Sequence, residues 1–376
     1  HQPASKSRVD GPFHWIPRYN HTSWKEAQRM SMSMARTTKP PGASAAPPMS
    51  STPSAADGEP VLALRDSLLL SQRSSTIARQ MGMIERELMA GIDWSELSEP
   101  SWDQHTVRQE QWQLEYQDYV MFRIRQTMND EPSEGQKDAL RQTIHGRGIH
   151  MLIARFNRTC AWVASHIVRS NNIQERVAIV NKFIRIAWHC YRQGNMESLC
   201  QIMFGLQSPW IARLQQTWEQ VSLWELRAFE ALRRFTSPRE QFAFLRYSMR
   251  EAIETNIPSR RFSPLTTSSS PYVPFFGQFV SDLSAIDSLA SFVDASGMPN
   301  TMPLYDDQEL SLSWDALVNV YRLRIKSHIV REFITLQRCQ RQAPAPPMEL
   351  PILIEVLQLD TLSAMAIQST SLALEP

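Results

Sequence analysis

The chain has 376 residues, enough for one large domain or two ordinary ones, and its 39 basic and 38 acidic side chains almost cancel. This balance argues against a general nucleic-acid binder, whose surface carries a basic excess. The four cysteines, Cys160, Cys190, Cys200 and Cys339, are too few and too scattered for a disulfide framework. No run of 18 uncharged apolar residues predicts a transmembrane helix, so we expect a cytosolic protein.

The amino-terminal part of the chain is low in large apolar residues. Pro, Ala, Ser and Thr dominate residues 31–60, which cannot offset the entropy cost of their own ordering. We therefore expect a disordered arm over residues 1–60 and an ordered domain from about Val61. A short aromatic island between Phe13 and Trp24 is a fragment of an upstream element, a strip that packs on the folded domain, or a docking motif for a partner.

Two helices are predicted in the next part of the chain. The first ends by Gly91 and is amphipathic, with apolar residues at Ile77, Met81, Ile84 and Leu88. The second lies in the polar stretch 103–147, where Leu114, Met121, Ile124 and Met128 keep helical spacing, with Tyr116 and Val120 alongside.

The stretch 171–218 carries the strongest helical pattern. Apolar residues recur in steps of three or four from Ile173 to Tyr191 and again from Met196 to Met203. Between them, Gly194 and Asn195 are expected to form a left-handed C-cap pair. Two buried helices joined by a tight turn would satisfy this pattern.

The remaining elements are also predicted to be helical. Residues 229–246 fit two helices broken at a Ser-Pro turn, and a Ser/Thr/Pro-rich insertion follows at 258–271. After a loop at 294–311, a long helix should start near Trp314. Its buried stripe is expected at Tyr321, Ile325, Ile329, Phe333 and Leu336. Because strand-like alternation is almost absent, we expect an all-α domain.

Residue identities in the central stretch add a family resemblance. The units in order are Glu175-Arg176, Phe183-Ile184, Asn195, Gly205-Leu206, Ser208, Arg213-Leu214 and Thr217-Trp218. They closely resemble the central block of the Ras guanine-nucleotide exchange factor family, of the Son-of-sevenless type. Segments 76–97, 149–168 and 329–337 resemble further blocks, so the resemblance covers about 75–376, with insertions near 103–147, 258–271 and 294–311.

The resemblance implies a bowl-shaped, multi-helix catalytic domain over 61–376 with a protruding helical hairpin. Such a domain stimulates GDP release from a Ras-like small GTPase, of Ras or Rap type, by inserting the hairpin at the switch region. It makes no covalent bond and needs no cofactor or metal. The resemblance implies neither nucleic-acid binding nor direct membrane insertion, so recruitment to the inner face of a membrane would come from the GTPase or from missing segments.

The first arm of the hairpin is expected at 272–290. The residues that the resemblance places in the exchange machinery are Phe275, Phe276, Ser281, Asp282, Ser284, Asp287 and Ser288. Here the glutamate typical of the family falls on Ser288, with Asp287 one residue away, and the residue that crowds the metal falls on Ser284. The residues expected to bind the GTPase are Arg155, Asn157, Gln207, Ser208, Arg213 and Arg246.

One alternative function stays open at this stage. A degenerate exchange-factor domain would bind a GTPase as a scaffold without accelerating release. A hairpin that points Asp287 into the nucleotide site would favour exchange, whereas one whose Leu289 and Phe292 cap it against the core would favour the scaffold. Enzyme classes are disfavoured, because the chain has no GxxxxGK[ST] loop, no zinc-like His/Cys spacing and no Gly-x-Ser-x-Gly.

Overall fold

A computed structural model describes residues 68–98, 107–128, 146–255, 271–299, 317–342 and 347–375, together with the single residues Gly135 and Ile144. The predicted arm over 1–60, its aromatic island and most of the insertions predicted near 258–271 and 294–311 lie outside the described residues. The all-α prediction is confirmed, since two strands of two residues each are the only strands among the described residues.

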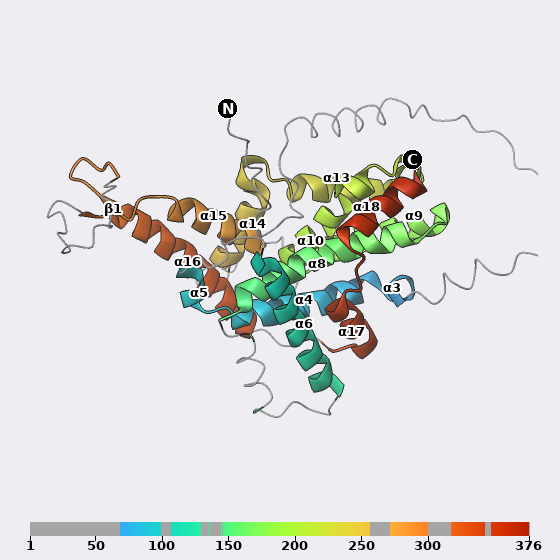
Figure 1. The fold of residues 1–376 in the computed structure, drawn as a ribbon, viewed down its shortest axis with the longest axis horizontal. Coiled ribbons are helices and arrows are strands. Elements are labelled where there is room, and N and C mark those ends of the chain that lie inside the picture. Colours follow the sequence, from blue (N-terminus) through green and yellow to red (C-terminus); the bar gives the residue numbers. More distant parts are fainter. Residues whose placement is uncertain are drawn as a thin grey trace, which may run out of the picture.

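The helices of the first half form the body of the domain (Figure 1). In chain order they are α3 (Leu68–Ser71), α4 (Ser74–Gly91), α5 (Trp94–Ser98), α6 (Val107–Met128), α8 (Gly148–Arg169), α9 (Ile173–Arg192), α10 (Met196–Leu206), α11 (Pro209–Ala212) and α12 (Gln215–Glu219).

The second half adds a pair of short helices, the hairpin and the carboxyl-terminal helices. These elements are α13 (Leu223–Phe235), the 3-10 helix η2 (Arg239–Gln241), α14 (Ala243–Thr255), α15 (Phe276–Asp287), β1 (Phe292–Val293), β2 (Leu317–Val318), α16 (Val320–Gln342), α17 (Leu350–Gln358) and α18 (Ala364–Leu374). The break predicted at the Ser-Pro turn is confirmed, because α13 ends just before it.

Helix α8 is the centre of the fold and packs against α10, α6, α4, α9 and α18. It is buried along nearly its whole length, including Phe156 and Trp162. Gly205 of α10 lets the two backbones approach closely, since a Cβ there would lie 2.8 Å from Val163 Cβ and 2.9 Å from the Cys160 carbonyl oxygen. The cysteines Cys160, Cys190 and Cys200 are buried in this core, whereas Cys339 is half-buried.

The turn between α9 and α10 contains one left-handed residue and not the expected pair. Gly194 has φ +73°, as expected, but Asn195 has φ −91°. The Asn195 side chain instead accepts a hydrogen bond from the Ser198 backbone N–H at 3.0 Å, which caps the start of α10. The prediction for Asn195 was therefore wrong, because capping a helix N-terminus requires an extended backbone rather than a left-handed one.

Helix α6 forms as predicted, but it buries a different face. Leu114 and Met121 are 61% and 53% exposed, whereas Trp112, Tyr116 and Tyr119 are buried. These aromatic side chains are buried because they find partners on neighbouring helices. The Trp112 ring stacks on His150 of α8 at 4.7 Å, and the Tyr119 hydroxyl donates to Glu87 of α4 at 2.8 Å.

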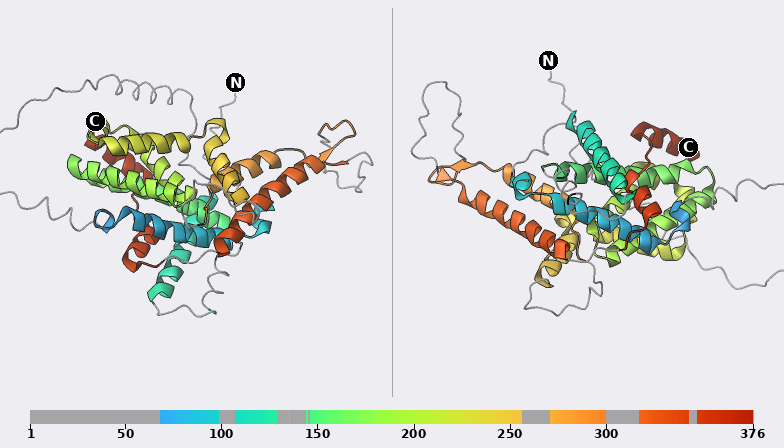
Figure 2. Two further views of the ribbon diagram at one scale, coloured as in Figure 1. Left: turned by 180° about the vertical axis from the view of Figure 1, so that it is seen from behind. Right: turned by 90° about the horizontal axis from the view of Figure 1, so that it is seen from below.

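Helices α15 and α16 form a hairpin that protrudes from the body, with the β1–β2 ribbon at its far end (Figures 1 and 2). The ribbon pairs Phe292 with Val318 and Val293 with Leu317. Because Leu317 and Val318 join this ribbon, α16 starts at Val320 and not near Trp314 as expected.

The buried stripe of α16 is shorter than predicted. Ile329, Phe333 and Leu336 are buried, while Tyr321 is 66% exposed. Tyr321 lies in the protruding part of the helix, beyond the body that would cover it. Within the described residues, no helix combines the length and the apolar character that a membrane crossing requires.

The close approach at Gly205 gives a first prediction. Gly205→Ala should destabilise the domain by about 1–3 kcal/mol, because a methyl group there overlaps backbone and side-chain atoms of α8. Urea unfolding followed by circular dichroism would measure the change. Gly82→Ala is the matched control within a helix: its Cβ meets only the Asn195 side-chain amide at 3.2 Å, so it should cost less. Equal stability of Gly205→Ala and wild type would contradict the packing described here.

Candidate functional site

The base of the hairpin is fixed to the α9–α10 turn by backbone hydrogen bonds. The Val273 N–H donates to the Gly194 carbonyl at 2.8 Å, and the Met196 N–H donates to the Val273 carbonyl at 2.8 Å. At the first residue of α15, the Phe276 N–H donates to Glu197 Oε2 at 2.8 Å. This carboxyl group satisfies one of the N–H groups that a helix leaves free at its start. The hairpin is therefore attached directly to the central block.

Two of the residues predicted for the exchange machinery lie in the core. Phe275 is 1% exposed, and its ring packs 5.7 Å from Phe156 and 5.3 Å from Phe242. Phe276 is fully buried, with its ring 5.7 Å from Phe333 of α16. The structure thus gives both phenylalanines an anchoring position at the hairpin base, where they cannot touch a partner directly.

Asp282 and Arg246 connect the hairpin to α14. Two parallel hydrogen bonds join the Arg246 guanidinium to the Asp282 carboxylate, each at 2.6 Å, and Arg246 Nε donates to the Gln241 carbonyl at 2.6 Å. The side chains are only 20% and 28% exposed, so this bidentate pair is shielded from solvent on most sides. It holds the first arm of the hairpin against α14.

Asp287 connects the two arms of the hairpin to each other. Its carboxylate lies 2.7 Å from the Arg322 guanidinium and 2.7 Å from the Lys326 ammonium, both on α16. Asp287 is therefore occupied within the hairpin. Leu289 and Phe292 are 38% and 43% exposed, so neither caps the hairpin against the core.

The exposed face of α15 consists of small side chains. Ser281, Ala285 and Ser288 are exposed at spacings of four and three residues, and Ser284 beside them is half-buried. The Ser288 hydroxyl donates to the Ala285 carbonyl at 2.7 Å. We call Ser281, Ala285 and Ser288 the α15 face. None of its three side chains carries a charge, so α15 can approach another surface closely but brings no carboxylate to it.

Arg155 is part of a buried polar network and not of the surface. It is fully buried, and its Nε donates to Glu85 Oε1 at 2.6 Å. Its Nη1 also donates to the Tyr116 hydroxyl at 2.7 Å and to the Val356 carbonyl at 2.8 Å. The expected partner contact for Arg155 is thus replaced by a structural role that joins α8, α4, α6 and α17.

The network continues to the hairpin through Gln201 and Glu197 of α10. Gln201 Nε2 donates to Glu85 Oε1 at 3.1 Å and to Glu197 Oε1 at 3.4 Å. Burial, together with the nearby Glu85 carboxylate, raises the pKa of Glu197 well above its usual range. Arg155 contacts Glu85 directly and reaches Glu197 only through Gln201, and the raised pKa of Glu197 favours its neutral form.

The other residues expected to bind a partner are turned toward their own chain. Asn157 and Ser208 are buried, at 4% and 1% exposure. Gln207 is half-buried and donates to the Met203 carbonyl at 3.0 Å. Arg213 is half-buried and donates to the Ser371 carbonyl of α18 at 2.7 Å. These residues stabilise the body. Gln207 and Arg213 are partly exposed, so only part of each side chain is accessible to a binding partner.

Sequence reasoning missed a set of exposed apolar side chains on α13 and α14. Leu223 and Trp224 are 63% and 52% exposed, and Phe244 and Tyr247 are 62% and 68% exposed. Phe244 and Tyr247 are three residues apart in a helix that buries Leu245 and Met249, so the amphipathic pattern of α14 contained the signal. Arg246 of the same helix pairs with Asp282, so α14 lies beside the first arm of the hairpin.

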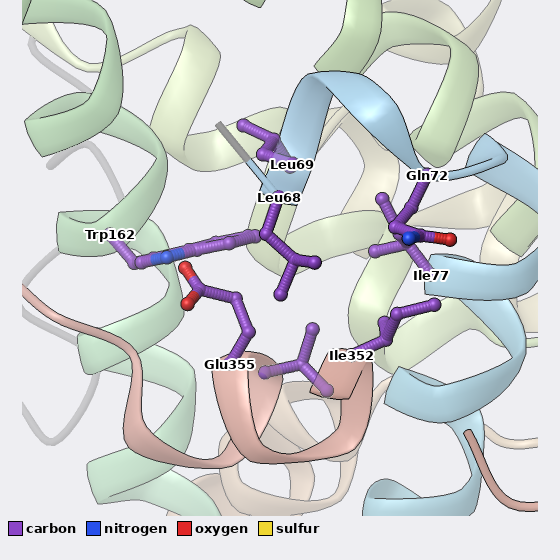
Figure 3. A pocket seen from close by; sticks show the side chains of 8 residues that line it. Leu68, Leu69, Gln72, Ile77, Trp162, Ile352 and Glu355 are labelled. Carbon is purple, nitrogen blue, oxygen red and sulfur yellow. The ribbon is translucent and has the colours of Figure 1, made fainter. Parts of the chain in front are cut away.

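A small cavity lies in another part of the body, between α3, α4, α8 and α17 (Figure 3). Leu68, Ile77, Trp162 and Ile352 line it, with the Glu355 carboxylate beside Trp162. Its volume is about 10 Å³, which leaves room for one water molecule at most. This cavity is too small for a nucleotide or a cofactor.

The sequence of the chain matches a known domain family. The model of the RasGEF domain family matches residues 76–324, more than half of the chain. The chain belongs to the RasGEF domain family. The match runs from α4 to the first turn of α16, so this RasGEF domain includes the central block, the first arm of the hairpin and the contacts at its base.

Several curated proteins resemble this RasGEF domain. Guanine nucleotide exchange factor LTE1 of Kluyveromyces lactis is 26% identical over 57% of the chain, and mouse Ras-specific guanine nucleotide-releasing factor 1 is 27% identical over 59%. Human Rap guanine nucleotide exchange factor 5 is 36% identical over 25% of the chain. The matched segments span only 13%, 15% and 16% of these relatives' own lengths, respectively.

The raised pKa of Glu197 gives a prediction for the pH dependence of stability. The pKa of Glu197 is higher in the folded domain than in the unfolded chain, where it is about 4.5. The contribution of Glu197 to the free energy of unfolding is therefore fully present below pH 4.5 and is lost as the pH rises through the folded-state pKa. Glu197→Gln keeps an oxygen for the Phe276 N–H but cannot ionise. The variant should therefore gain stability relative to wild type as the pH increases above about 4.5.

Thermal unfolding over a pH series would measure this difference. Glu219→Gln, at an exposed position of α12, is the control and should keep the wild-type profile. A difference between Glu197→Gln and wild type that does not change with pH would show that Glu197 is not protonated.

Proposed function

We propose that this RasGEF domain stimulates the release of GDP from a Ras-like small GTPase. The observation that carries the proposal is the protruding α15–α16 hairpin, whose base is fixed to the central block while its arms extend away from the body (Figure 2). A rigid projection of this kind can enter another protein without losing its own shape. The named relatives are exchange or releasing factors, which supports the same activity.

The reaction needs no bond-making chemistry from this chain. An exchange factor acts by binding the nucleotide-free GTPase more tightly than the nucleotide-bound one. The exchange factor and the nucleotide therefore each weaken the binding of the other to the GTPase. A 1000-fold acceleration requires about 4 kcal/mol of such preference. This free energy comes from the contacts between the two proteins.

We assign direct contact to the α15 face and to the exposed aromatics of α14. The small side chains Ser281, Ala285 and Ser288 would let α15 lie close to the switch region, where its bulk displaces a loop. Phe244 and Tyr247 would supply the apolar contact area, because exposed aromatic side chains are the usual anchors of protein interfaces.

The other predicted residues act in this proposal by positioning. Phe275 and Phe276 anchor the hairpin base, Asp282 and Arg246 fix its angle to α14, and Asp287 joins its two arms. Ser284 is half-buried beside the α15 face. Gln207 and Arg213 support the body on which the partner would rest. The GTPase would be of Ras or Rap type, because the similar proteins include one named for each.

One observation favours a second function, a GTPase-binding scaffold without exchange activity. Asp287 is held by Arg322 and Lys326, and the α15 face has no carboxylate to compete for a phosphate-binding loop. Exchange by this hairpin would then depend only on the steric displacement of a switch loop of the GTPase. The two functions share the binding surface and differ in whether binding accelerates release.

The test is the release of a fluorescent GDP analogue from purified Ras and Rap GTPases, with and without the full chain. Wild type should accelerate release from at least one of them. Ser281→Arg/Ser288→Arg should reduce the acceleration by roughly 10–100-fold, because two long cationic side chains would keep α15 from its partner. Ser327→Arg, at an exposed serine of α16, is the matched control and should behave as wild type.

Binding measurements separate the two candidate functions. A chain that captures a nucleotide-free GTPase but leaves its release rate unchanged is a scaffold. Acceleration that survives Ser281→Arg/Ser288→Arg would remove the α15 face from the mechanism.

A further inference from the structure

The outward side of α16 carries a row of cationic side chains. Arg324, His328, Arg331 and Arg338 are all exposed, at spacings of four, three and seven residues. Residues at these spacings lie on one side of a helix. From Arg324 to Arg338 the row extends over about 21 Å at 1.5 Å per residue. We call these four residues the basic stripe.

Within the part of the chain that the structure describes, few acidic side chains lie near the basic stripe. Glu332 is the single acidic residue of α16, and it lies 3.4 Å from His328. Among the described residues, no ion pair involves Arg324, Arg331 or Arg338. The chain as a whole is almost neutral, so a row of this length reflects a local concentration of charge and not a general basic excess.

The stripe begins next to exposed apolar side chains at the far end of the hairpin. Leu317 and Val318 of the ribbon are each 52% exposed, and Val320 and Tyr321 at the start of α16 are 67% and 66% exposed. Apolar side chains grouped at the end of a projection are unusual on a surface that faces only water.

We propose that the basic stripe and this apolar end bind the surface of an anionic lipid bilayer. Arginines near such a surface are attracted to anionic headgroups, by about 1 kcal/mol each. The apolar side chains can enter the boundary between headgroups and acyl chains, as in helices that lie on membranes. An acidic protein would match the arginines but would leave Leu317, Val318 and Tyr321 without an apolar environment, so the combination favours lipid.

This surface is separate from the contact assigned to the GTPase. Arg322 and Lys326 of α16 turn toward Asp287 of α15, whereas the stripe residues lie on the outward side of α16. A membrane bound along the stripe therefore leaves the α15 face uncovered. The binding is peripheral and involves no spanning helix.

Sedimentation of the full chain with lipid vesicles tests the proposal. Wild type should bind vesicles that contain phosphatidylserine and not vesicles of phosphatidylcholine alone, and its binding should weaken as salt is added. Arg324→Ala/Arg331→Ala/Arg338→Ala should reduce binding about 100-fold, or about fivefold for each arginine. The same three positions changed to Lys should keep binding within about twofold, because the charge remains.

The control removes an equal charge elsewhere. Arg192→Ala/Arg227→Ala/Arg234→Ala changes three exposed arginines on α9 and α13 and should bind vesicles as wild type does. Equal losses in the two triple variants, or equal binding of wild type to both kinds of vesicle, would overturn the proposal. The stripe variant should also accelerate nucleotide release in solution as wild type does. Loss of that activity would assign the stripe to the GTPase instead of the membrane.

Discussion

The ion pair between Arg155 and Glu85 is the interaction on which the rest of the structure depends. Both side chains are fully buried, and removing one partner of such a pair typically costs about 3–5 kcal/mol, because the other charge is left uncompensated. Through Tyr116, Val356, Gln201 and Glu197 the same network reaches α6, α17, α10 and the first residue of α15. The raised pKa of Glu197 favours its neutral form, which lowers the cost of burying it near Glu85.

This arrangement explains why so few of the expected site residues are at the surface. A buried charge is costly unless it is paired and hydrogen-bonded. Arg155 and Glu85 find their partners in the body, and the hairpin joins the network through the Phe276 N–H on Glu197. Arg246, Asp282 and Asp287 are likewise used to hold helices together. The hairpin thus gains a fixed position at the cost of free carboxylates on α15. Its contact with a GTPase then depends on shape and apolar area, supplied by small serines and by Phe244 and Tyr247.

The helices of this domain could be predicted from the sequence because their apolar residues recur at helical spacing. The order and spacing of Glu175-Arg176, Asn195 and Gly205-Leu206 also indicated the family. The roles of single side chains could not be predicted, because burial depends on the surroundings. Arg155 and a surface arginine look alike in the sequence, and only the positions of Glu85 and Tyr116 distinguish them. For α6 the pattern itself misled, since aromatic residues with polar partners outweighed the aliphatic stripe of Leu114 and Met121.

The hydrogen bond from the Phe276 N–H to Glu197 also bears on the order of folding. These residues are 79 positions apart, so the bond closes a long loop, whose entropy cost the burial around it must offset. We therefore expect the hairpin base to form together with the packing of the body and not before it. Once formed, it opens only when α10 moves, so the Phe276 amide should exchange its hydrogen as slowly as the amides of the central helices, while amides near the far end of the hairpin exchange much faster.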